Sequence, residues 1–211
     1  MTIKAVIFDM DGVLIDAKEW HYESLNNALC LFGYEISRHD HLVTYDGLPT
    51  KKKLEMLSME SGLPRSLHSF VNRMKQQNTM EIVSAKCKPV FYHQYALAKL
   101  RESGLRLAVA SNSIRKTVTS MLEYADLAQY VEFSLSNEDV SKPKPDPEIY
   151  TTAIERLQLA PEECVIVEDN LNGIKAARAA GGHVLEVARV EDVNYANIRR
   201  MVEECDNGER Q

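Results

Sequence analysis

The chain has 211 residues, of which 45% are hydrophobic and 27% are charged, a composition typical of a globular protein with a packed core. Its formal net charge of −6 argues against nucleic acid or an anionic membrane surface as an obligate partner. No apolar run approaches the roughly 18 residues of a membrane span, and the N-terminus lacks the apolar stretch of a secretory signal.

The first predicted element is a strand over residues 3–8, an apolar run rich in β-branched side chains. It ends in Asp9-Met10-Asp11-Gly12, where two carboxylates flank one residue and a glycine lets the chain turn. In open α/β sheets, ligand sites lie beyond the carboxyl ends of the strands, so Asp9 and Asp11 are candidate functional residues. An aspartate at a strand end is also a common turn former, and a single such residue would leave both interpretations open.

Residues 17–85 then show a helical pattern almost throughout, with predicted helices over residues 21–32, 51–61 and 67–82. Gly62-Leu63-Pro64 and Tyr45-Asp46-Gly47-Leu48-Pro49 mark breaks between these helices. The block carries eight basic and eight acidic side chains, so the net negative charge belongs to the rest of the chain. A connection of this length must have its own structure, and we predict a small helical domain inserted after the first strand.

A second strand is predicted over residues 105–110, after a helix over residues 90–103. It ends in Ser111-Asn112-Ser113, and a hydroxyl group with successive backbone N–H groups at a helix start forms a cradle for phosphate. Serine and asparagine are also ordinary helix caps, which is the simpler interpretation of this string in isolation. A helix over residues 117–128 and a third strand over residues 131–135 follow.

Two further strings of polar residues occupy comparable positions. Ser141-Lys142-Pro143-Lys144-Pro145-Asp146-Pro147 places lysines on a proline-stiffened loop before a predicted helix over residues 147–157. A fourth strand, over residues 165–168, ends in Glu168-Asp169-Asn170, and Asn172-Gly173 opens a helix over residues 173–180. Paired acidic residues at a strand end suit an oxygen-ligated Mg²⁺, whereas solvated lysines and helix-capping carboxylates are the simpler interpretations.

Strands that alternate with helices of 10–15 residues indicate βαβ units and a parallel sheet. With a fifth strand over residues 183–187, the sequence predicts the α/β class, a Rossmann-like doubly wound parallel sheet with an inserted helical cap domain. We assign residues 1–16 and 86–205 to the α/β catalytic core, residues 17–85 to the cap domain and residues 206–211 to a flexible tail.

The four polar strings, each after its own strand and in this order, resemble the signatures of the haloacid dehalogenase superfamily. The resemblance covers nearly all of the chain to about residue 190, and the helical block resembles the cap that this family inserts between its first two motifs. Within the superfamily, the lysine-bearing string and Glu168-Asp169-Asn170 are most similar to the β-phosphoglucomutase and phosphoglycolate phosphatase-like branch.

This resemblance implies roles for individual residues. Asp9 would be the nucleophile that forms an aspartyl-phosphate, and Asp11 the general acid and then the general base. Ser111 and the amide of Asn112 would hold the transferring phosphate, and Lys142 would neutralise charge between this phosphate and Asp9. The metal ligands of Mg²⁺ would be the Asp9 carboxylate, the Asp11 carbonyl, Asp169 and, directly or through water, Glu168. Cation and lysine would offset the repulsion between a carboxylate and a phosphate dianion.

The presence of Asp11 separates this chain from dehalogenases and phosphonate-cleaving members, which lack the second aspartate. We therefore predict a Mg²⁺-dependent phosphatase that hydrolyses a small phosphate monoester. The alternative is a sugar phosphomutase of the β-phosphoglucomutase kind. A non-catalytic phospho-acceptor or binding module is disfavoured because Asp9 and Asp11 are both present.

The cap bears on the choice between phosphatase and mutase. In β-phosphoglucomutase the loop equivalent to residues 47–51 carries an arginine where this sequence has Thr50, and threonine cannot form a bidentate phosphate clamp. Lys51 and its two neighbours supply point charges, while His21 and Lys75 match a histidine and a lysine of that branch. A partly buried histidine and a solvated lysine run are the alternative interpretations.

The four cysteines are widely spaced and form no Cys-x-x-Cys pair, so we expect reduced thiols in a cytoplasmic protein. The expected partner is a small-molecule phosphate ester, with no nucleic acid and no membrane, and we expect a monomer. The sequence does not identify the ester, because cap residues choose it and the catalytic residues are shared by the whole family.

Overall fold

Five short strands form one parallel sheet in the computed structural model of the chain, which describes residues 2–208. The strands are β1 (Ala5–Phe8), β2 (Arg106–Ala110), β3 (Phe133–Leu135), β4 (Cys164–Glu168) and β5 (His183–Glu186). Their order in the sheet is β3-β2-β1-β4-β5, so β1 lies between β2 and β4. Phe8 pairs with Val109 of β2 and with Val167 of β4. This arrangement confirms the predicted α/β class with a Rossmann-like parallel sheet.

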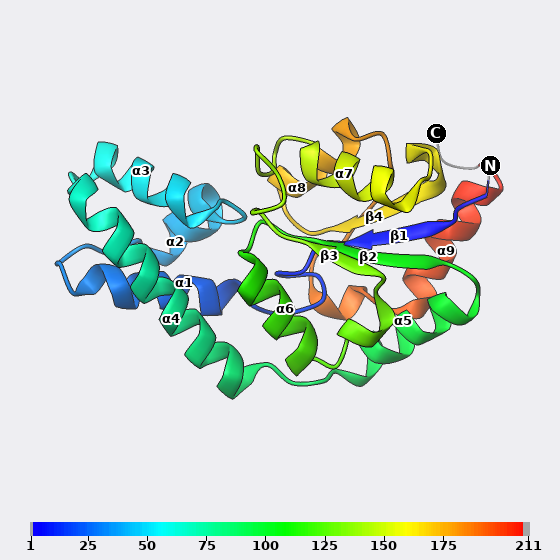
Figure 1. Cartoon of the computed structure of the whole chain (residues 1–211), viewed down its shortest axis with the longest axis horizontal. Coiled ribbons are helices and arrows are strands. Elements are labelled where there is room, and N and C mark those ends of the chain that lie inside the picture. Colours follow the sequence, from blue (N-terminus) through cyan, green and yellow to red (C-terminus); the bar gives the residue numbers. More distant parts are fainter. Residues whose placement is uncertain (1, 209–211) are drawn as a thin grey trace. The chain divides into compact units, whose positions relative to one another are not determined.

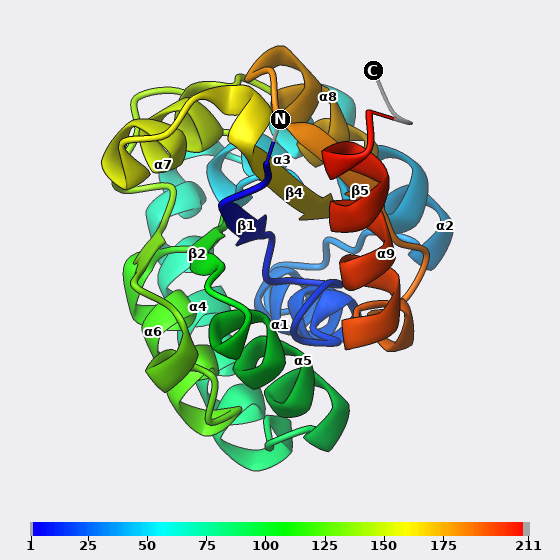
Figure 2. The same ribbon diagram turned by 90° about the vertical axis from the view of Figure 1, so that its right-hand side faces the viewer.

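Helices cover both faces of this sheet. They are α5 (Phe91–Glu102), α6 (Arg115–Tyr124), α7 (Glu148–Leu157), α8 (Leu171–Ala179) and α9 (Tyr195–Asp206), with the short turns η3 (Ala128–Tyr130), η4 (Pro161–Glu163) and η5 (Val190–Asp192). Helices α7 and α8 lie over one face, whereas α5 and α9 pack together over the other (Figures 1 and 2). The strands are therefore buried on both sides, which explains their nearly uninterrupted apolar sequences.

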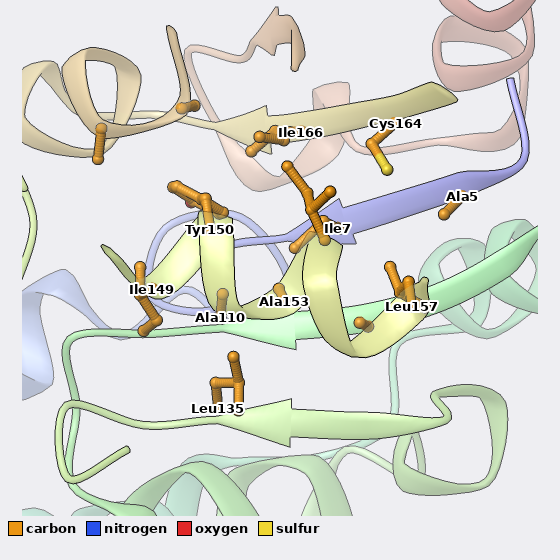
Figure 3. Packing of buried hydrophobic residues seen from close by; sticks show 14 residues of the cluster. Ala5, Ile7, Ala110, Leu135, Ile149, Tyr150, Ala153, Leu157, Cys164 and Ile166 are labelled. Atoms are coloured by element: carbon orange, nitrogen blue, oxygen red, sulfur yellow. The ribbon is translucent and has the colours of Figure 1, made fainter. Parts of the chain in front are cut away.

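The α7 face of the sheet holds a cluster of alternate strand residues. Because successive side chains of a strand point to opposite faces, Ala5 and Ile7 of β1 face α7 together with Ile166 of β4 (Figure 3). From α7 itself, Tyr150 and Leu157 enter the same cluster, and both are fully buried. This packing fixes α7, and with it the Tyr150 side chain, against the central strands.

The chain divides into two compact units, one formed by Ala17–Cys87 and the other by the segments on either side. The helical unit contains α1 (Lys18–Cys30), α2 (Arg38–Asp40), η1 (His41–Tyr45), α3 (Thr50–Glu60), η2 (Arg65–Leu67) and α4 (His68–Lys86). The boundary lies two residues beyond the predicted one because α4 continues to Lys86.

The helical unit has a hydrophobic core of its own. Helices α1 and α4 pack along one another, and Leu25, Leu29 and Val71 are buried within this core. Asn26 fixes the chain after α1, since its side chain donates to the carbonyl of Ile36 and accepts from the amide of Ile36, both at 2.9 Å. The helical unit thus has an apolar core that is separate from the cluster on the sheet.

The C-terminal helix α9 was not predicted. Ile198, Met201, Val202 and Cys205 are buried along one of its faces, and Asn194 caps its first turn. The predicted flexible tail is wrong at Asp206, which ends this helix and accepts a 2.6 Å hydrogen bond from the amide of Ile3. Residues 209–211 of the predicted tail lie outside the described residues. Within residues 2–208, no helix is both long and apolar enough to cross a membrane.

Candidate active site

Three neighbouring strands bring the candidate residues to one edge of the sheet. Asp9 follows β1 directly, Ser111 follows β2, and Glu168 is the last residue of β4. Asp9 is held at this edge by a 3.0 Å hydrogen bond from its amide to the carbonyl of Val167. Its side chain is only 7% exposed, so a carboxylate is buried at the position where parallel α/β sheets bind ligands.

The buried ammonium of Lys144 contacts the Asp9 carboxylate. Its Nζ lies 2.6 Å from Asp9 Oδ1 and 2.7 Å from Glu168 Oε1, and it also donates to the carbonyl of Ala110 and to the Tyr150 hydroxyl, both at 2.8 Å. The Lys144 side chain is 2% exposed. Lysine is almost never buried unless it is paired, and here two carboxylates pair with it.

The structure corrects the choice of lysine made from the sequence. Lys142 does not lie against Asp9: its side chain is 73% exposed, and its Nζ is 3.8 Å from the Asp146 carboxylate. The Glu148 carboxylate accepts hydrogen bonds from the amides of Ser141 and Lys142 and so holds this part of the loop at the surface. Lys144, two residues later, is the residue that enters the site.

The Asn112 side chain holds the backbone of Lys144 through both its amide and its carbonyl group. Its Oδ1 accepts from the Lys144 amide at 3.1 Å, and its Nδ2 donates to the Lys144 carbonyl at 3.3 Å. The resemblance implied a role for Asn112 only through its backbone amide. The side chain therefore has a second part in the site, because it joins the loop after β2 to the lysine-bearing loop.

Asp11 is held by two hydroxyl groups of the loop after β2. Ser113 Oγ donates to Asp11 Oδ2 at 2.7 Å, and Ser111 Oγ lies 3.4 Å from the same oxygen. Ser111 Oγ also accepts from the amide of Ser113 at 3.0 Å. The structure thus brings Asp11 next to Ser111 and also next to Ser113, which belongs to the same predicted string.

Three carboxylates at this edge are close enough to share a cation. Asp9, Glu168 and Asp169 each offer one oxygen, and these oxygens all lie within 4.8 Å of one another. Glu168 is fully buried and Asp169 is partly buried. Magnesium prefers carboxylate and carbonyl oxygens, so this donor set fits Mg²⁺ better than a metal that needs nitrogen or sulfur ligands.

The electrostatics of the site centre on Asp9 and Lys144. Burial raises the pKa of the Asp9 carboxyl well above its ordinary value, with Glu168, Asp169 and Asp11 acting in the same direction and Lys144 acting against them. Burial alone would lower the pKa of Lys144, but the Asp9 and Glu168 carboxylates hold that pKa above its ordinary value. The lysine therefore stays charged, and an arriving cation would favour the ionised form of Asp9.

Tyr150 was not predicted from the sequence. Its hydroxyl accepts from Lys144 Nζ at 2.8 Å and donates to Glu168 Oε1. Burial raises the pKa of this phenol well above its ordinary value, and Glu168 adds to the effect. The hydroxyl thus remains a hydrogen-bond donor, and no sequence signal distinguishes this tyrosine from a residue of the apolar core.

The four predicted cap residues all lie in the helical unit. Lys75 Nζ lies 3.1 Å from His21 Nδ1, so two of the four candidates form a pair between α4 and α1. Thr50 begins α3 and is partly buried, while Lys51 is exposed. Of the three consecutive lysines, only Lys53 is buried.

The chain is similar to known proteins over most of its length. A family model described as haloacid dehalogenase-like hydrolase matches residues 6–187. A phosphorylated carbohydrates phosphatase of Thermotoga maritima is 30% identical over 85% of this chain and 82% of its own length. A phosphoglycolate phosphatase of Nitrosospira multiformis is 29% identical over 87% and 82%. The crystal structure of a β-phosphoglucomutase from Clostridium difficile superposes with a TM-score of 0.84, at 18% identity, over 96% of this chain and 98% of that one.

Proposed function

The chain belongs to the haloacid dehalogenase-like hydrolases, and from this premise we propose that it is a Mg²⁺-dependent phosphatase acting through an aspartyl-phosphate on Asp9. The observation that carries this proposal is the buried Asp9 carboxylate with the Lys144 ammonium 2.6 Å away. A carboxylate is a poor nucleophile towards a phosphate dianion, and a buried cation beside it reduces their repulsion.

In the proposed first step, Asp9 attacks phosphorus, and the bond between phosphorus and the ester oxygen breaks. Asp11 gives its proton to the departing alkoxide, so that an alcohol leaves. Asp11, now ionised, takes a proton from water, and this water attacks the phosphorus of the aspartyl-phosphate. Inorganic phosphate leaves, and the Asp9 carboxylate is restored.

The other residues of the site bind and orient. We assign the transferring phosphate to the hydroxyl of Ser111 and the amide of Asn112, with the charge of Lys144 next to it. The Asp9, Glu168 and Asp169 carboxylates and the Asp11 carbonyl would hold Mg²⁺. When bound, Mg²⁺ supplies positive charge that offsets the charge of the phosphate in the transition state.

For the substrate we propose a small phosphorylated carbohydrate or organic acid, because two relatives of 30% and 29% identity are named for such esters. Recognition of its alcohol part falls to the helical unit, for which His21, Lys75, Thr50 and Lys51 remain our candidates.

The four cysteines form no disulfide with one another, which supports a reducing cytoplasmic location, and we propose a monomer.

A sugar phosphomutase is the alternative considered from the sequence. The β-phosphoglucomutase structure is 18% identical to this chain, a level at which the likeness concerns the fold and not the reaction. Thr50 stands where a mutase of this branch has an arginine, and this loss of a bidentate phosphate ligand favours water over a sugar hydroxyl as acceptor. We therefore expect hydrolysis to exceed isomerisation.

The test is a screen of phosphate release over sugar phosphates, nucleotides and phosphoglycolate, with and without Mg²⁺. Purified Asp9→Asn is the control, and it should lose all release while keeping the fold, because an amide is isosteric but not nucleophilic. Glucose 6-phosphate is measured in parallel with β-glucose 1-phosphate as substrate. If glucose 6-phosphate forms faster than free phosphate, and traces of the bisphosphate stimulate its formation, the protein is a mutase and the phosphatase proposal is wrong.

A further inference from the structure

The Tyr150 hydroxyl lies at the centre of the charged residues around Asp9, although its ring belongs to the apolar core. The residue comes from α7, and the ring packs among the side chains that face this helix from the sheet (Figure 3). The hydroxyl contacts Lys144 Nζ at 2.8 Å and Glu168 Oε1. All three side chains are buried, so water does not replace these contacts.

The direction of each hydrogen bond follows from the groups involved. An ammonium can only donate, and an ionised carboxylate can only accept. The phenol therefore accepts from Lys144 Nζ and gives its single proton to Glu168 Oε1. Tyr150 is in this way a neutral group that bonds to both members of the Lys144–Glu168 pair.

Two carboxylates compete for the same ammonium. Lys144 Nζ is 2.6 Å from Asp9 Oδ1 and 2.7 Å from Glu168 Oε1, so it is shared almost equally between them. The proton from Tyr150 goes to the same Glu168 oxygen that contacts Lys144. It thereby satisfies part of the hydrogen-bonding capacity of Glu168 and weakens the pull of this carboxylate on the ammonium.

We propose that Tyr150 is a positioning residue that keeps the Lys144 ammonium shared between Asp9 and Glu168. Without the hydroxyl, Oε1 of Glu168 loses one of its two donors and keeps Lys144, while the Asp169 amide and the Asn170 side chain donate to Oε2, so the ammonium moves towards Glu168 and away from the nucleophile. The catalytic consequence rests on the proposed function, since it matters only if Asp9 attacks phosphate. The positional consequence does not depend on it.

The variant Tyr150→Phe tests the role of the hydroxyl independently of the ring. The variant keeps the ring in the apolar cluster and removes only the group that contacts Lys144 and Glu168. Tyr124→Phe is the matched control, because Tyr124 is 46% exposed at the end of α6 and lies outside the site. Both variants are to be studied as the full chain with Mg²⁺.

We expect Tyr150→Phe to lower kcat about 10- to 100-fold with little change in the KM of the ester, since a small displacement of a charged group costs this much. Tyr124→Phe should match the wild type in both constants. Crystal structures of Tyr150→Phe and wild type should show a longer distance from Lys144 Nζ to Asp9 Oδ1 in the variant.

The outcomes separate this inference from the proposed function. A wild-type kcat in Tyr150→Phe, or an unchanged distance between Lys144 Nζ and Asp9 Oδ1, overturns the positioning role. A wild-type protein that releases no phosphate from any ester overturns the proposed function, and the crystallographic distance then still decides the positional claim. An equal loss in Tyr150→Phe and Tyr124→Phe would mean a general effect of removing tyrosines and would also overturn it.

Discussion

Gly173 lies directly against the carboxylate of Glu168. A Cβ atom added at position 173 would come within 1.9 Å of Glu168 Oε1 and 2.2 Å of Oε2, far inside any normal contact. Gly173 is in the first turn of α8 and has an ordinary helical backbone, so the space and not the conformation requires glycine here. The packing of the helix start thus keeps the buried carboxylate where it meets Lys144 and Tyr150.

The first prediction follows from this contact. Gly173→Ala should destabilise the protein by about 1–3 kcal/mol, the usual cost of overpacking, although alanine is the better helix former. In a Glu168→Ala background the same change should be stabilising, because the clashing carboxylate is gone. A double-mutant cycle of unfolding free energies measures both. Destabilisation of equal size in the two backgrounds would mean that Glu168 is not the cause.

The second prediction separates the two lysines. Lys144→Met should reduce turnover about 100-fold or more, because a buried charge-assisted contact to Asp9 is lost. Lys142→Met should stay within about twofold of wild type, since an exposed lysine 3.8 Å from a carboxylate contributes little. Steady-state kinetics of both variants, with circular dichroism to show that Lys144→Met is folded, provides the comparison. A larger loss of turnover in Lys142→Met than in Lys144→Met would mean that Lys142, and not Lys144, acts in the site.

The third prediction concerns the metal. Activity should disappear with EDTA, return with Mg²⁺ and be poorly supported by Ca²⁺. Calcium accepts more ligands at longer distances, so it can engage both oxygens of the Asp9 carboxylate and hinder attack. Rates measured with each cation at saturating concentration decide this point. Equal turnover with Ca²⁺ and Mg²⁺ would contradict it.

The fourth prediction concerns pH and Asp9. Burial raises the pKa of Asp9 in the folded metal-free protein above the ordinary 3.8, so the folded state binds this proton more tightly than the unfolded state does. Protonated Asp9 therefore stabilises the folded state. This stabilisation is fully present below the ordinary pKa of the unfolded chain and is lost as the pH rises through the raised pKa of the folded protein. In EDTA, Asp9→Asn should therefore have a higher Tm than wild type at about pH 7, and the gap should narrow towards about pH 5. A difference in Tm that grows on acidification would contradict this prediction, because it would mean that the pKa shift of Asp9 has the opposite sign.

Much of the fold is readable from the sequence because the central strands are buried on both faces. Ala5–Phe8 and residues 164–167 of β4 are continuous apolar runs, and the polar residues that follow them mark the functional edge of the sheet. The helix α9 had a readable signal as well. Its buried residues Ile198, Met201, Val202 and Cys205 have helical spacing after the capping Asn194, but the polar residues around them hid the pattern.

The choice between Lys142 and Lys144 was not decidable from local sequence. The dipeptide Lys-Pro occurs twice, two residues apart, and both copies precede the same helix. What distinguishes them is tertiary: Asn112, from a loop far away in the chain, binds the backbone of Lys144 on both sides. The role of Tyr150 depends in the same way on Glu168, which only the folded sheet brings to it.

The central claim, a phosphoryl group carried on Asp9, is tested most directly by mapping the phosphorylated residue. Asp11→Asn is mixed with p-nitrophenyl phosphate and Mg²⁺, because this leaving group needs little protonation while hydrolysis of the aspartyl-phosphate still needs Asp11 as base. The reaction is quenched in acid, and peptides are analysed by mass spectrometry. We predict one phosphoryl group on the peptide that contains Asp9, and none in the Asp9→Asn, Asp11→Asn double variant. A phosphoryl group on another residue, or on none while p-nitrophenol is released, would contradict the account.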